Sequence, residues 1–386
     1  MMVRSYPALL LCLASVLACG PKQQPTTSPE PGPAEPAAPP VDPIPAEFGA
    51  LTPEMIVPDI QAALDFYGSA FGAQTISTLE GPDGNPIHAE IKIGDSMIIL
   101  DMGSNNTLDP ARENMKDPMA LGGSPVTLML YVEDADAAFD NAVQAGAVVN
   151  MPLEDQFWGD RYGDLIDPFG HAWAVATHIE DLTAEQLEQR AALIPPPSKK
   201  KKRRKKGKPK WAEIVGTPAT QKVPEGYHTV TMALTVSSGA EAIDYYVKAF
   251  GANERGRLAS PDGRLIHAEL EIGGDILMLS DENPVQGTTS AKTLGGSPVM
   301  LHHYVTDADS TFGAAVSNGG TEMMALEDTL WGDRYGALVD PTGLPWGVAT
   351  HKEDVSLDQI KERMAAAGGG TPAEAEPAEA AAEPAT

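Results

Sequence analysis

The sequence predicts an α+β protein with two tandem domains, each made of paired βαβββ units. The block Trp-Gly-Asp-Arg-Tyr-Gly occurs at residues 158–163 and again at 331–336, and the Asp-Pro-x-Gly turn after it repeats at the same offset of 173 residues. A motif that recurs at fixed spacing indicates a duplicated domain. Within each copy, stretches with helical periodicity follow stretches in which apolar and polar residues alternate as in a strand.

The first copy is expected to run through the order strand, helix and three strands twice. Its first half predicts a strand at 52–57, a helix at 60–71 and strands at 75–79, 88–93 and 97–100, because Gly72 ends the helix and Gly94-Asp95 forms a hairpin. Its second half predicts a strand at 126–132, a helix at 136–145 before Gly146, and strands at 148–151, 162–166 and 172–176.

The second copy repeats this order. We expect a strand at 229–236, a helix at 240–250 and strands at 267–272 and 276–279. Gly-Gly-Ser-Pro enters the second half at 295–298, as it does at 122–125 in the first copy. The first halves are offset by 179 residues and the second halves by 173, so the length difference lies in the loop after the fourth strand, where it is tolerated.

The N-terminus has the features of a bacterial lipoprotein signal. Arg4 precedes an apolar run at 7–18 that is too short to span a membrane, and Val16-Leu17-Ala18-Cys19-Gly20 resembles a lipoprotein processing site. This resemblance implies cleavage before Cys19, lipidation of that residue, and a location in the bacterial cell envelope on a periplasm-facing membrane. An ordinary signal peptide with an incidental cysteine remains the alternative.

The remaining boundaries follow from composition. We assign 1–18 to the signal, 19–50 to a Pro-rich disordered tether, 51–180 and 227–353 to the two domains, 181–226 to a helix with a basic linker, and 354–386 to a short helix and an Ala/Glu/Pro-rich disordered tail.

Charge is distributed unevenly. Ten of the 27 Lys and Arg residues lie between Lys199 and Lys210, whereas 54 Asp and Glu residues give the chain a net charge of -27. The domains are therefore acidic, which argues against a nucleic-acid partner. The basic run is expected to be extended and disordered, and it either binds an anionic envelope component or acts as a solvated spacer.

Two sets of repeated polar residues are candidates for a pocket. His88 and Glu90, with their counterparts His267 and Glu269, alternate with apolar residues and share the face of the third strand that lies opposite the helices. The motif supplies the second set, in which Trp can stack on a planar ligand and Arg can clamp an anion: Trp158, Arg161, Tyr162, Trp331, Arg334 and Tyr335. Structural roles for both sets remain open, including a loop braced by an Asp-Arg bridge.

Several segments resemble the vicinal oxygen chelate superfamily, which includes glyoxalase I, bleomycin-resistance proteins and extradiol dioxygenases. They are the helices at 65–73 and 244–252, the turn at 167–173 and the repeated motif. The resemblance implies mixed sheets that form a concave cup, with four metal ligands on the first and fourth strands of each half. Those positions would be Thr52, Ile98, Thr127 and Ala174 in the first domain, and Thr231, Leu277 or Met278, Met300 and Gly347 in the second.

None of these residues is a good ligand for a divalent cation, so we expect no usual metal centre and no cofactor. An alternative site from His267, Glu269, His302 and His351 would hold zinc, nickel, manganese or iron. The first functional hypothesis is an exported, membrane-anchored protein that binds a planar or anionic small molecule in each domain. The others are a metal-dependent lyase or isomerase of the glyoxalase type that uses the His-Glu pairs, and a non-catalytic envelope scaffold. The sequence leaves open how the domains pair.

Overall fold

The computed structural model describes residues 41–81, 83–103, 115–194, 208–260, 262–283, 285 and 287–367, and residues from Val41 onward form one compact unit. The predicted signal with Cys19, nearly all of the basic run and the C-terminal tail lie outside the described residues. No helix among the described residues is long and apolar enough to cross a membrane.

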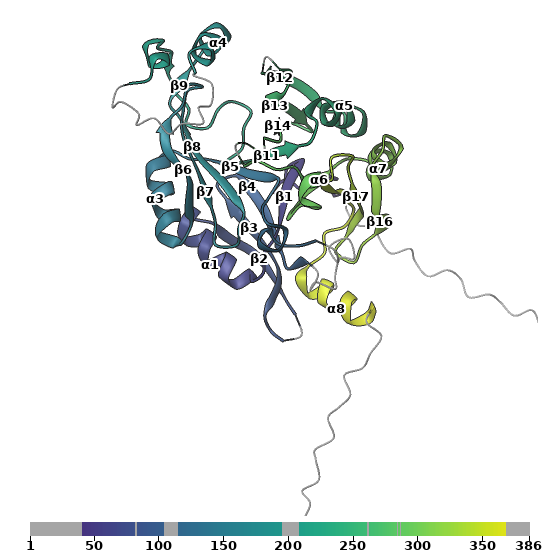
Figure 1. Cartoon of the computed structure of the whole chain (residues 1–386). Helices are drawn as coiled ribbons and strands as arrows, with labels where there is room; N and C mark the ends of the chain where they lie inside the picture. Colours follow the sequence, from purple (N-terminus) through teal and green to yellow (C-terminus); the bar gives the residue numbers. More distant parts are fainter. Residues whose placement is uncertain are drawn as a thin grey trace, which may run out of the picture. The chain divides into compact units, whose positions relative to one another are not determined.

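The chain forms four βαβββ modules in succession (Figure 1). The first contains β1 (Leu51–Ile56), α1 (Ile60–Phe71), β2 (Gln74–Glu80), β3 (Pro86–Ile93) and β4 (Ser96–Asp101). The second contains β5 (Val126–Tyr131), α3 (Ala135–Ala145), β6 (Val148–Asp155), β7 (Asp160–Ile166) and β8 (Ala172–His178). The third contains β11 (Val230–Val236), α5 (Gly239–Phe250), β12 (Asn253–Ala259), β13 (Leu265–Ile272) and β14 (Asp275–Asp281). The fourth contains β15 (Val299–Tyr304), α7 (Ala308–Ser317), β16 (Thr321–Asp328), β17 (Asp333–Val339) and β18 (Pro345–His351).

The predicted fold class is confirmed: the protein is α+β, with two eight-stranded mixed sheets. Each sheet nevertheless combines modules from both sequence repeats. The sheet that we call sheet A has the order β16-β17-β18-β15-β1-β4-β3-β2, so the first module pairs with the fourth. Sheet B has the order β12-β13-β14-β11-β5-β8-β7-β6, so the third module pairs with the second. The open question of domain pairing is thereby answered: the repeats exchange halves within one chain.

The helices do not take part in this exchange. Helix α1 packs on α3 and α5 packs on α7, both within their own repeats. The largest core side chains, Trp173 and Trp346, are fully buried under these helices, as the strand alternation predicts. Each indole donates a hydrogen bond to the aspartate of the Asp-Pro turn, Asp167 or Asp340, so that the buried Trp nitrogen is satisfied.

Two connections carry the chain from one sheet to the other. Residues 102–125 contain the short helix α2 (Pro118–Leu121), and residues 282–298 contain α6 (Ala291–Leu294). Gly122 and Gly295 end these helices with φ of 82° and 81°, a left-handed conformation in which a side chain is strained. The repeated Gly-Gly-Ser-Pro sequence thus marks the two crossing points.

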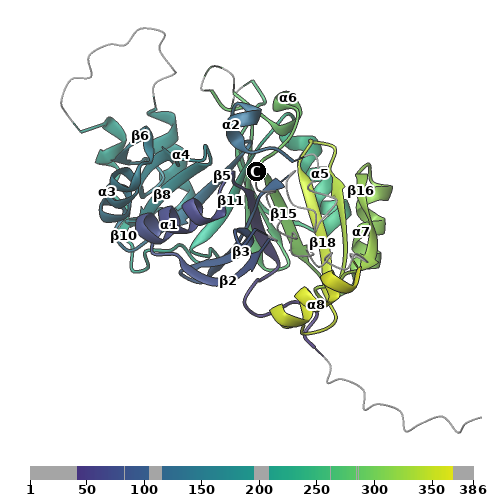
Figure 2. The same ribbon diagram turned by 90° about the horizontal axis from the view of Figure 1, so that it is seen from below.

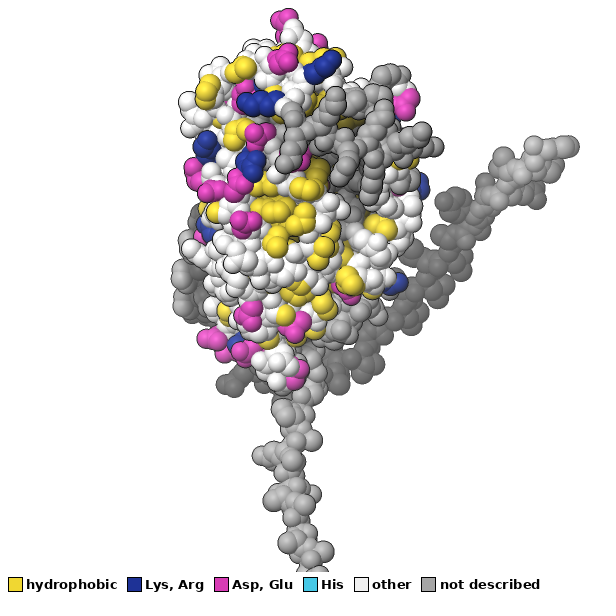
Figure 3. Space-filling view, turned by 60° about the vertical axis from the view of Figure 1, so that its left-hand side comes forward, with side chains coloured by type: hydrophobic (Ala, Val, Ile, Leu, Met, Phe, Trp, Pro, Cys, Tyr) yellow, Lys and Arg dark blue, Asp and Glu magenta, His cyan; other side chains and the backbone are white. Residues whose placement is uncertain are grey.

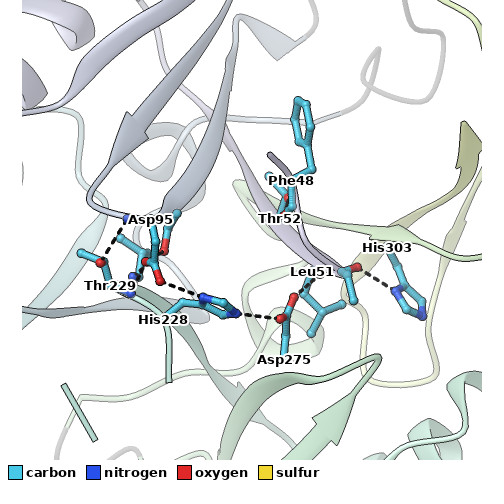
Figure 4. Close-up of polar contacts among 11 residues, drawn as sticks. Phe48, Leu51, Thr52, Asp95, His228, Thr229, Asp275 and His303 are labelled. Carbon is cyan, nitrogen blue, oxygen red and sulfur yellow. Dashed lines mark hydrogen bonds and ion pairs between the residues drawn. The ribbon is translucent and has the colours of Figure 1, made fainter. Parts of the chain in front are cut away.

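A polar cluster joins the two sheets where these modules meet (Figure 4). The Leu51 amide at the start of β1 donates to the Asp275 carboxylate at the start of β14, over 2.7 Å. His228 lies between two carboxylates, with Nδ1 3.0 Å from Asp95 and Nε2 3.0 Å from Asp275. The Thr229 amide also donates to Asp95, and this bonding lowers the pKa of Asp95 to about 2 against the opposing effect of burial.

Most local predictions hold. Helix α1 has the predicted bounds, because Asp59 caps its first turn and Gly72 adopts the left-handed conformation at its end. The helix expected after the first domain is α4 (Ala184–Ala192), and the one expected near the C-terminus is α8 (Leu357–Ala367). The strand predicted at 148–151 is longer, since β6 continues to Asp155. The face in Figure 3 carries acidic side chains with basic ones among them, around a central patch of hydrophobic side chains.

Candidate functional site

The concave face of sheet A, which we call cup A, holds a cavity of about 660 Å³. Its wall combines residues of the first and fourth modules with residues of α8, which lies beside this sheet in Figures 1 and 2. The cavity is therefore assembled only because the repeats exchange halves. The residues that line it include Phe48, His88, Glu90, Ile99, His302, Tyr304, Trp331, Asp333, Tyr335, His351 and Asp354.

The predicted pair on the third strand lies in this cavity. His88 and Glu90 both line it, as their alternation along β3 predicts. His88 Nδ1 lies 3.0 Å from the Asp101 carboxylate on the neighbouring strand β4. The Ser77 hydroxyl donates to Glu90 over 2.8 Å. Both side chains thus have fixed orientations toward the cavity.

A third acidic residue, Glu54, lies beneath the floor of cup A. It is fully buried at the centre of sheet A, where it pairs in register with Met300 on β15 and Ile99 on β4. Its neighbours Met55 and Val57 belong to the core beneath the helices, whereas Ile56 belongs to the cup cluster, so Glu54 faces the cup. Sequence reasoning missed this residue, although a polar side chain within an apolar strand was a visible signal.

Aromatic rings form much of the wall. His302 stacks on Tyr335 with 5.5 Å between ring centroids and 13° between planes. Trp331 contacts Tyr335 edge-on at 5.8 Å, and Phe48 contacts Tyr304 at 5.6 Å. These rings offer a planar, apolar surface beside the acidic floor.

Asp333 organises the rim of cup A. Its carboxylate accepts a hydrogen bond from the Tyr304 hydroxyl over 2.9 Å and lies 2.8 Å from His351 Nδ1. The other nitrogen of His351 lies 3.0 Å from Asp354. Burial disfavours the imidazolium, but Asp354 and Asp333 outweigh this effect and raise the pKa of His351. His351, at the end of β18, therefore lies at the rim of cup A.

Cup B, the concave face of sheet B, repeats this rim with Asp160, Tyr131 and His178. Its interior differs from that of cup A. Ala233 replaces Glu54 and Met129 replaces His302 at the equivalent positions, and Asp164 takes the place of Ala337. His267 Nε2 lies 3.2 Å from Glu269, and this contact, together with a hydrogen bond from Tyr227, lowers the pKa of Glu269 against the effect of burial.

The motif arginines do not reach either cup. Arg161 donates to Asp136 on α3 and to Asp155, and Arg334 donates to Asp309 on α7. Strand alternation explains this placement, because Asp333 and Tyr335 face cup A while Arg334 between them faces the opposite side. The expected anion clamp is therefore not assembled, and neither is an Asp-Arg bridge within the motif. Trp158 donates instead to Asp160 and contacts Tyr162 edge-on.

The positions that hold the family's metal do not fit a metal here. The exchange regroups them as Thr52, Ile99, Met300 and Gly347 in cup A, and as Thr231, Met278, Thr127 and Ala174 in cup B. Ile98 and Leu277 belong to the core beneath the helices, so the cup-facing residues of β4 and β14 are Ile99 and Met278. Neither set contains an imidazole or a carboxylate.

The alternative metal site is also not assembled. His267 and Glu269 lie in sheet B, whereas His302 and His351 lie in sheet A. Among the described residues, no group of three or more His, Cys, Asp or Glu side chains is placed to hold a metal ion.

The paired βαβββ modules and their cups define the class of protein. The chain belongs to the Glyoxalase/Bleomycin resistance protein/Dioxygenase superfamily, whose family model matches residues 49–175 and 228–348. Glyoxalase I from Zea mays has the same fold, with a TM-score of 0.51 and 14% identity over 83% of this chain and 97% of that chain.

Two sequence relatives match a shorter part of the chain. An uncharacterized protein of Mycobacterium bovis is 47% identical over 140 residues, which are 36% of this chain and 92% of the relative. An uncharacterized protein of Arabidopsis thaliana is 27% identical over 129 residues, or 32% of this chain and 76% of the relative.

Proposed function

We propose that the protein binds a planar small organic molecule in cup A and holds it without the metal centre typical of the family. The observation that carries this proposal is the cavity of about 660 Å³, lined by aromatic rings and a few oriented polar groups. Cavities of this size and composition are typical of small-molecule sites. The residues at the family's metal positions include no imidazole and no carboxylate. This favours binding and sequestration of the ligand over Lewis-acid chemistry.

Binding to a panel of planar aromatic fragments, followed by saturation-transfer NMR, tests this proposal. We expect signals with the intact protein that Trp331→Ala abolishes and that Trp158→Ala, the equivalent change in cup B, leaves in place. Arg334→Ala should also leave binding unchanged, because its ion pairs lie on the other side of the sheet. Binding that survives Trp331→Ala in a folded variant would place the site elsewhere.

Metal content tests the remaining part of the proposal. Purified protein is expected to retain no stoichiometric zinc, nickel, manganese or iron after dialysis, as measured by elemental mass spectrometry. A stoichiometric metal that is lost on His88→Ala or His267→Ala would instead support a lyase or isomerase.

We propose further that the protein is exported and anchored through lipidated Cys19, with the basic run at 199–210 close to an anionic envelope component. The signal-like segment before Cys19 supports the anchor, and the charge of the run supports the contact. Mass spectrometry of the mature N-terminus checks the anchor: lipid on Cys19 is expected, and Cys19→Ala should release the protein from membranes. Retention of an unmodified N-terminus would contradict it.

A further inference from the structure

We propose that His228 is a proton-operated clamp: its charged imidazole ties sheet A to sheet B and holds the segment that carries Phe48 into the wall of cup A. When the imidazole loses its proton, the clamp opens and cup A binds its ligand less tightly. The part of this inference that concerns the ligand rests on the proposed function. The clamp itself rests on the polar cluster between the sheets (Figure 4) and on the way in which that cluster continues into cup A.

The geometry around His228 requires a charged ring. Its Nδ1 lies 3.0 Å from the Asp95 carboxylate and its Nε2 lies 3.0 Å from the Asp275 carboxylate. A neutral imidazole carries a proton on one nitrogen only, so it would donate to one carboxylate and turn a lone pair toward the other. Only the imidazolium satisfies both contacts. Burial disfavours the imidazolium, but Asp95 and Asp275 outweigh this effect and raise the pKa of His228.

The two carboxylates beside His228 take part in hydrogen bonds that cross between the sheets. Asp95 lies in the turn between β3 and β4 of sheet A and accepts from the Thr229 amide, next to β11 of sheet B, over 2.7 Å. Asp275 begins β14 of sheet B and accepts from the Leu51 amide of β1 in sheet A, also over 2.7 Å. The charged ring therefore fixes the acceptor of one crossing hydrogen bond on each of its two sides.

The other ionisable groups nearby leave His228 as the group that changes charge near neutral pH. A cavity of about 90 Å³ adjoins the cluster, and Glu47 is the further acidic residue on its wall. None of the described residues that line this cavity is Lys or Arg. The pKa of Asp95 is lowered to about 2, so this carboxylate stays charged. Burial lowers the pKa of the neighbouring His303, so that ring stays neutral. The cavity has room for a few water molecules, which can replace the hydrogen bonds of the clamp when it opens.

The two repeats are not equivalent at this junction. In the second repeat the amide that corresponds to that of β1, the Val230 amide, donates over 2.9 Å to the uncharged Ser96 hydroxyl rather than to a carboxylate. The counterpart of His228 in the first repeat is Gly49. Gly49 has a φ of 71°, and a side chain there would approach the Asp275 carboxylate to 3.2 Å. A histidine is therefore disfavoured at that position, and the clamp acts on the segment before β1.

This segment continues the cluster into cup A. Asp275 holds Leu51, and Phe48 lines both the cavity beside the clamp and cup A. The Thr52 hydroxyl donates to the Phe48 carbonyl over 2.9 Å, and the Phe48 ring packs on Tyr304 with 5.6 Å between centroids. Opening of the clamp therefore loosens the segment that positions one aromatic ring of the binding wall.

Hydrogen exchange of the full chain, followed by NMR without any ligand, tests the clamp. The Leu51 and Thr229 amides report on it, because they donate to its two carboxylates. A raised histidine pKa stabilises the folded state fully below about pH 6.5, and this stabilisation is lost as the pH rises through the raised value. Protection of both amides, corrected for the intrinsic effect of pH on exchange, should therefore fall about fivefold from pH 6 to pH 8.5, a modest change because both ion pairs are partly exposed. His228→Gln should remove this dependence.

Two controls separate the clamp from general effects of pH. His178, at the rim of cup B, also lies between two carboxylates, so His178→Gln removes a similar ion pair. This variant should leave the pH dependence at Leu51 and Thr229 unchanged. The Ile56 amide, at the far end of β1, donates to the Pro298 carbonyl, and its corrected protection should not change with pH.

Binding of naphthalene-2-carboxamide, a planar probe that does not titrate in this range, tests the effect on cup A. Its affinity for the unchanged protein should fall about threefold over the same pH range, and the fall should be smaller in His228→Gln. The other ionisable groups of cup A are present in both proteins, so the difference between the two profiles belongs to His228. Thermal unfolding checks that the variant keeps its fold.

The outcomes separate this inference from the function on which it rests. Protection that depends equally on pH in His228→Gln, or that does not depend on pH in the unchanged protein, would overturn the clamp. A clamp seen by exchange, with the same affinity profile in both proteins, would overturn the link to cup A and leave small-molecule binding intact. Absence of probe binding at every pH would count against the proposed function and the link, while the exchange result still decides the clamp.

Discussion

His171, in the turn between β7 and β8, is a buried histidine that links the two sheets. Its side chain is 1% exposed, and Nε2 lies 2.9 Å from the carbonyl oxygen of Ile56 on β1. Nδ1 has no hydrogen-bond partner among the described residues. Burial lowers the pKa of His171 by more than Asp167 and the Ile56 carbonyl raise it, so the folded protein keeps this ring neutral.

The substitution His171→Leu tests whether the buried imidazole stays neutral. Leucine is chosen because the second repeat has the buried Leu344 at the same position. As the pH falls below about 6.5, the unfolded chain takes up a proton at His171 that the folded protein does not, so the native protein loses stability. Each unit of difference between the two pKa values is worth about 1.4 kcal/mol. The free energy of unfolding of His171→Leu, measured by urea denaturation from pH 8 to pH 5, should therefore fall less than that of the unchanged protein. Parallel pH profiles would mean that His171 titrates normally.

Several site residues were predictable from alternation, and others were not. His88 and Glu90 were found because polar residues at i and i+2 share one face of β3. The same rule, applied to β7 and β17, would have placed Arg161 and Arg334 opposite the tyrosines of the motif. Glu54 was missed because residues 52–57 were predicted only as a strand, and the surroundings of Glu54 depend on the strands β4 and β15 that flank β1.

At the scale of elements, α4 and α8 follow the last strand of the first and the second repeat, but different contacts hold them in place. Arg190 of α4 is 1% exposed, donates to the carbonyl oxygen of Ile214, and stacks over Trp211 at 5.4 Å. Arg363 of α8 binds the Leu330 carbonyl and Glu353 but is partly exposed, and the described residues contain no counterpart of the Trp211 contact. Helix α8, which lines cup A, is thus held less firmly than α4.

Ending the chain after Asp354 tests whether α8 retains the ligand. This change keeps the contact between His351 and Asp354 but removes Leu357 and Ile360 from the cavity wall. Loss of two apolar contacts of this size is worth about 1–3 kcal/mol, so dissociation of a bound planar aromatic fragment should become about tenfold faster or more. A chain ended after Ala367 is the control and should behave as the full chain. Equal dissociation rates in both would assign α8 a role outside the site.

At the scale of the whole molecule, the sequence predicted the modules correctly but could not predict their pairing. Helix bounds, hairpins and strand faces depend on residues close in sequence, and these were largely foreseeable. Strand β1 could pair with β15 or with β5, because both are the first strands of their modules and have similar patterns; the sequence does not distinguish partners that lie far apart in the chain. The same limitation explains why His267 and His302 were combined in one hypothetical metal site although they lie in different sheets.

Producing the repeats as two separate polypeptides, residues 41–194 and 208–367, tests the exchange. Cup A takes His88 and Glu90 from the first and Trp331 and Tyr335 from the second, so neither polypeptide alone contains a complete cavity. Each alone exposes unpaired edges of β1 and β5, or of β11 and β15, and should self-associate or aggregate. Mixed during refolding, the two should form a 1:1 complex by native mass spectrometry that binds the planar aromatic fragments, and binding should be lost when Trp331→Ala is introduced into the second polypeptide. A monomeric first repeat that binds these fragments alone would show that the modules pair within a repeat instead.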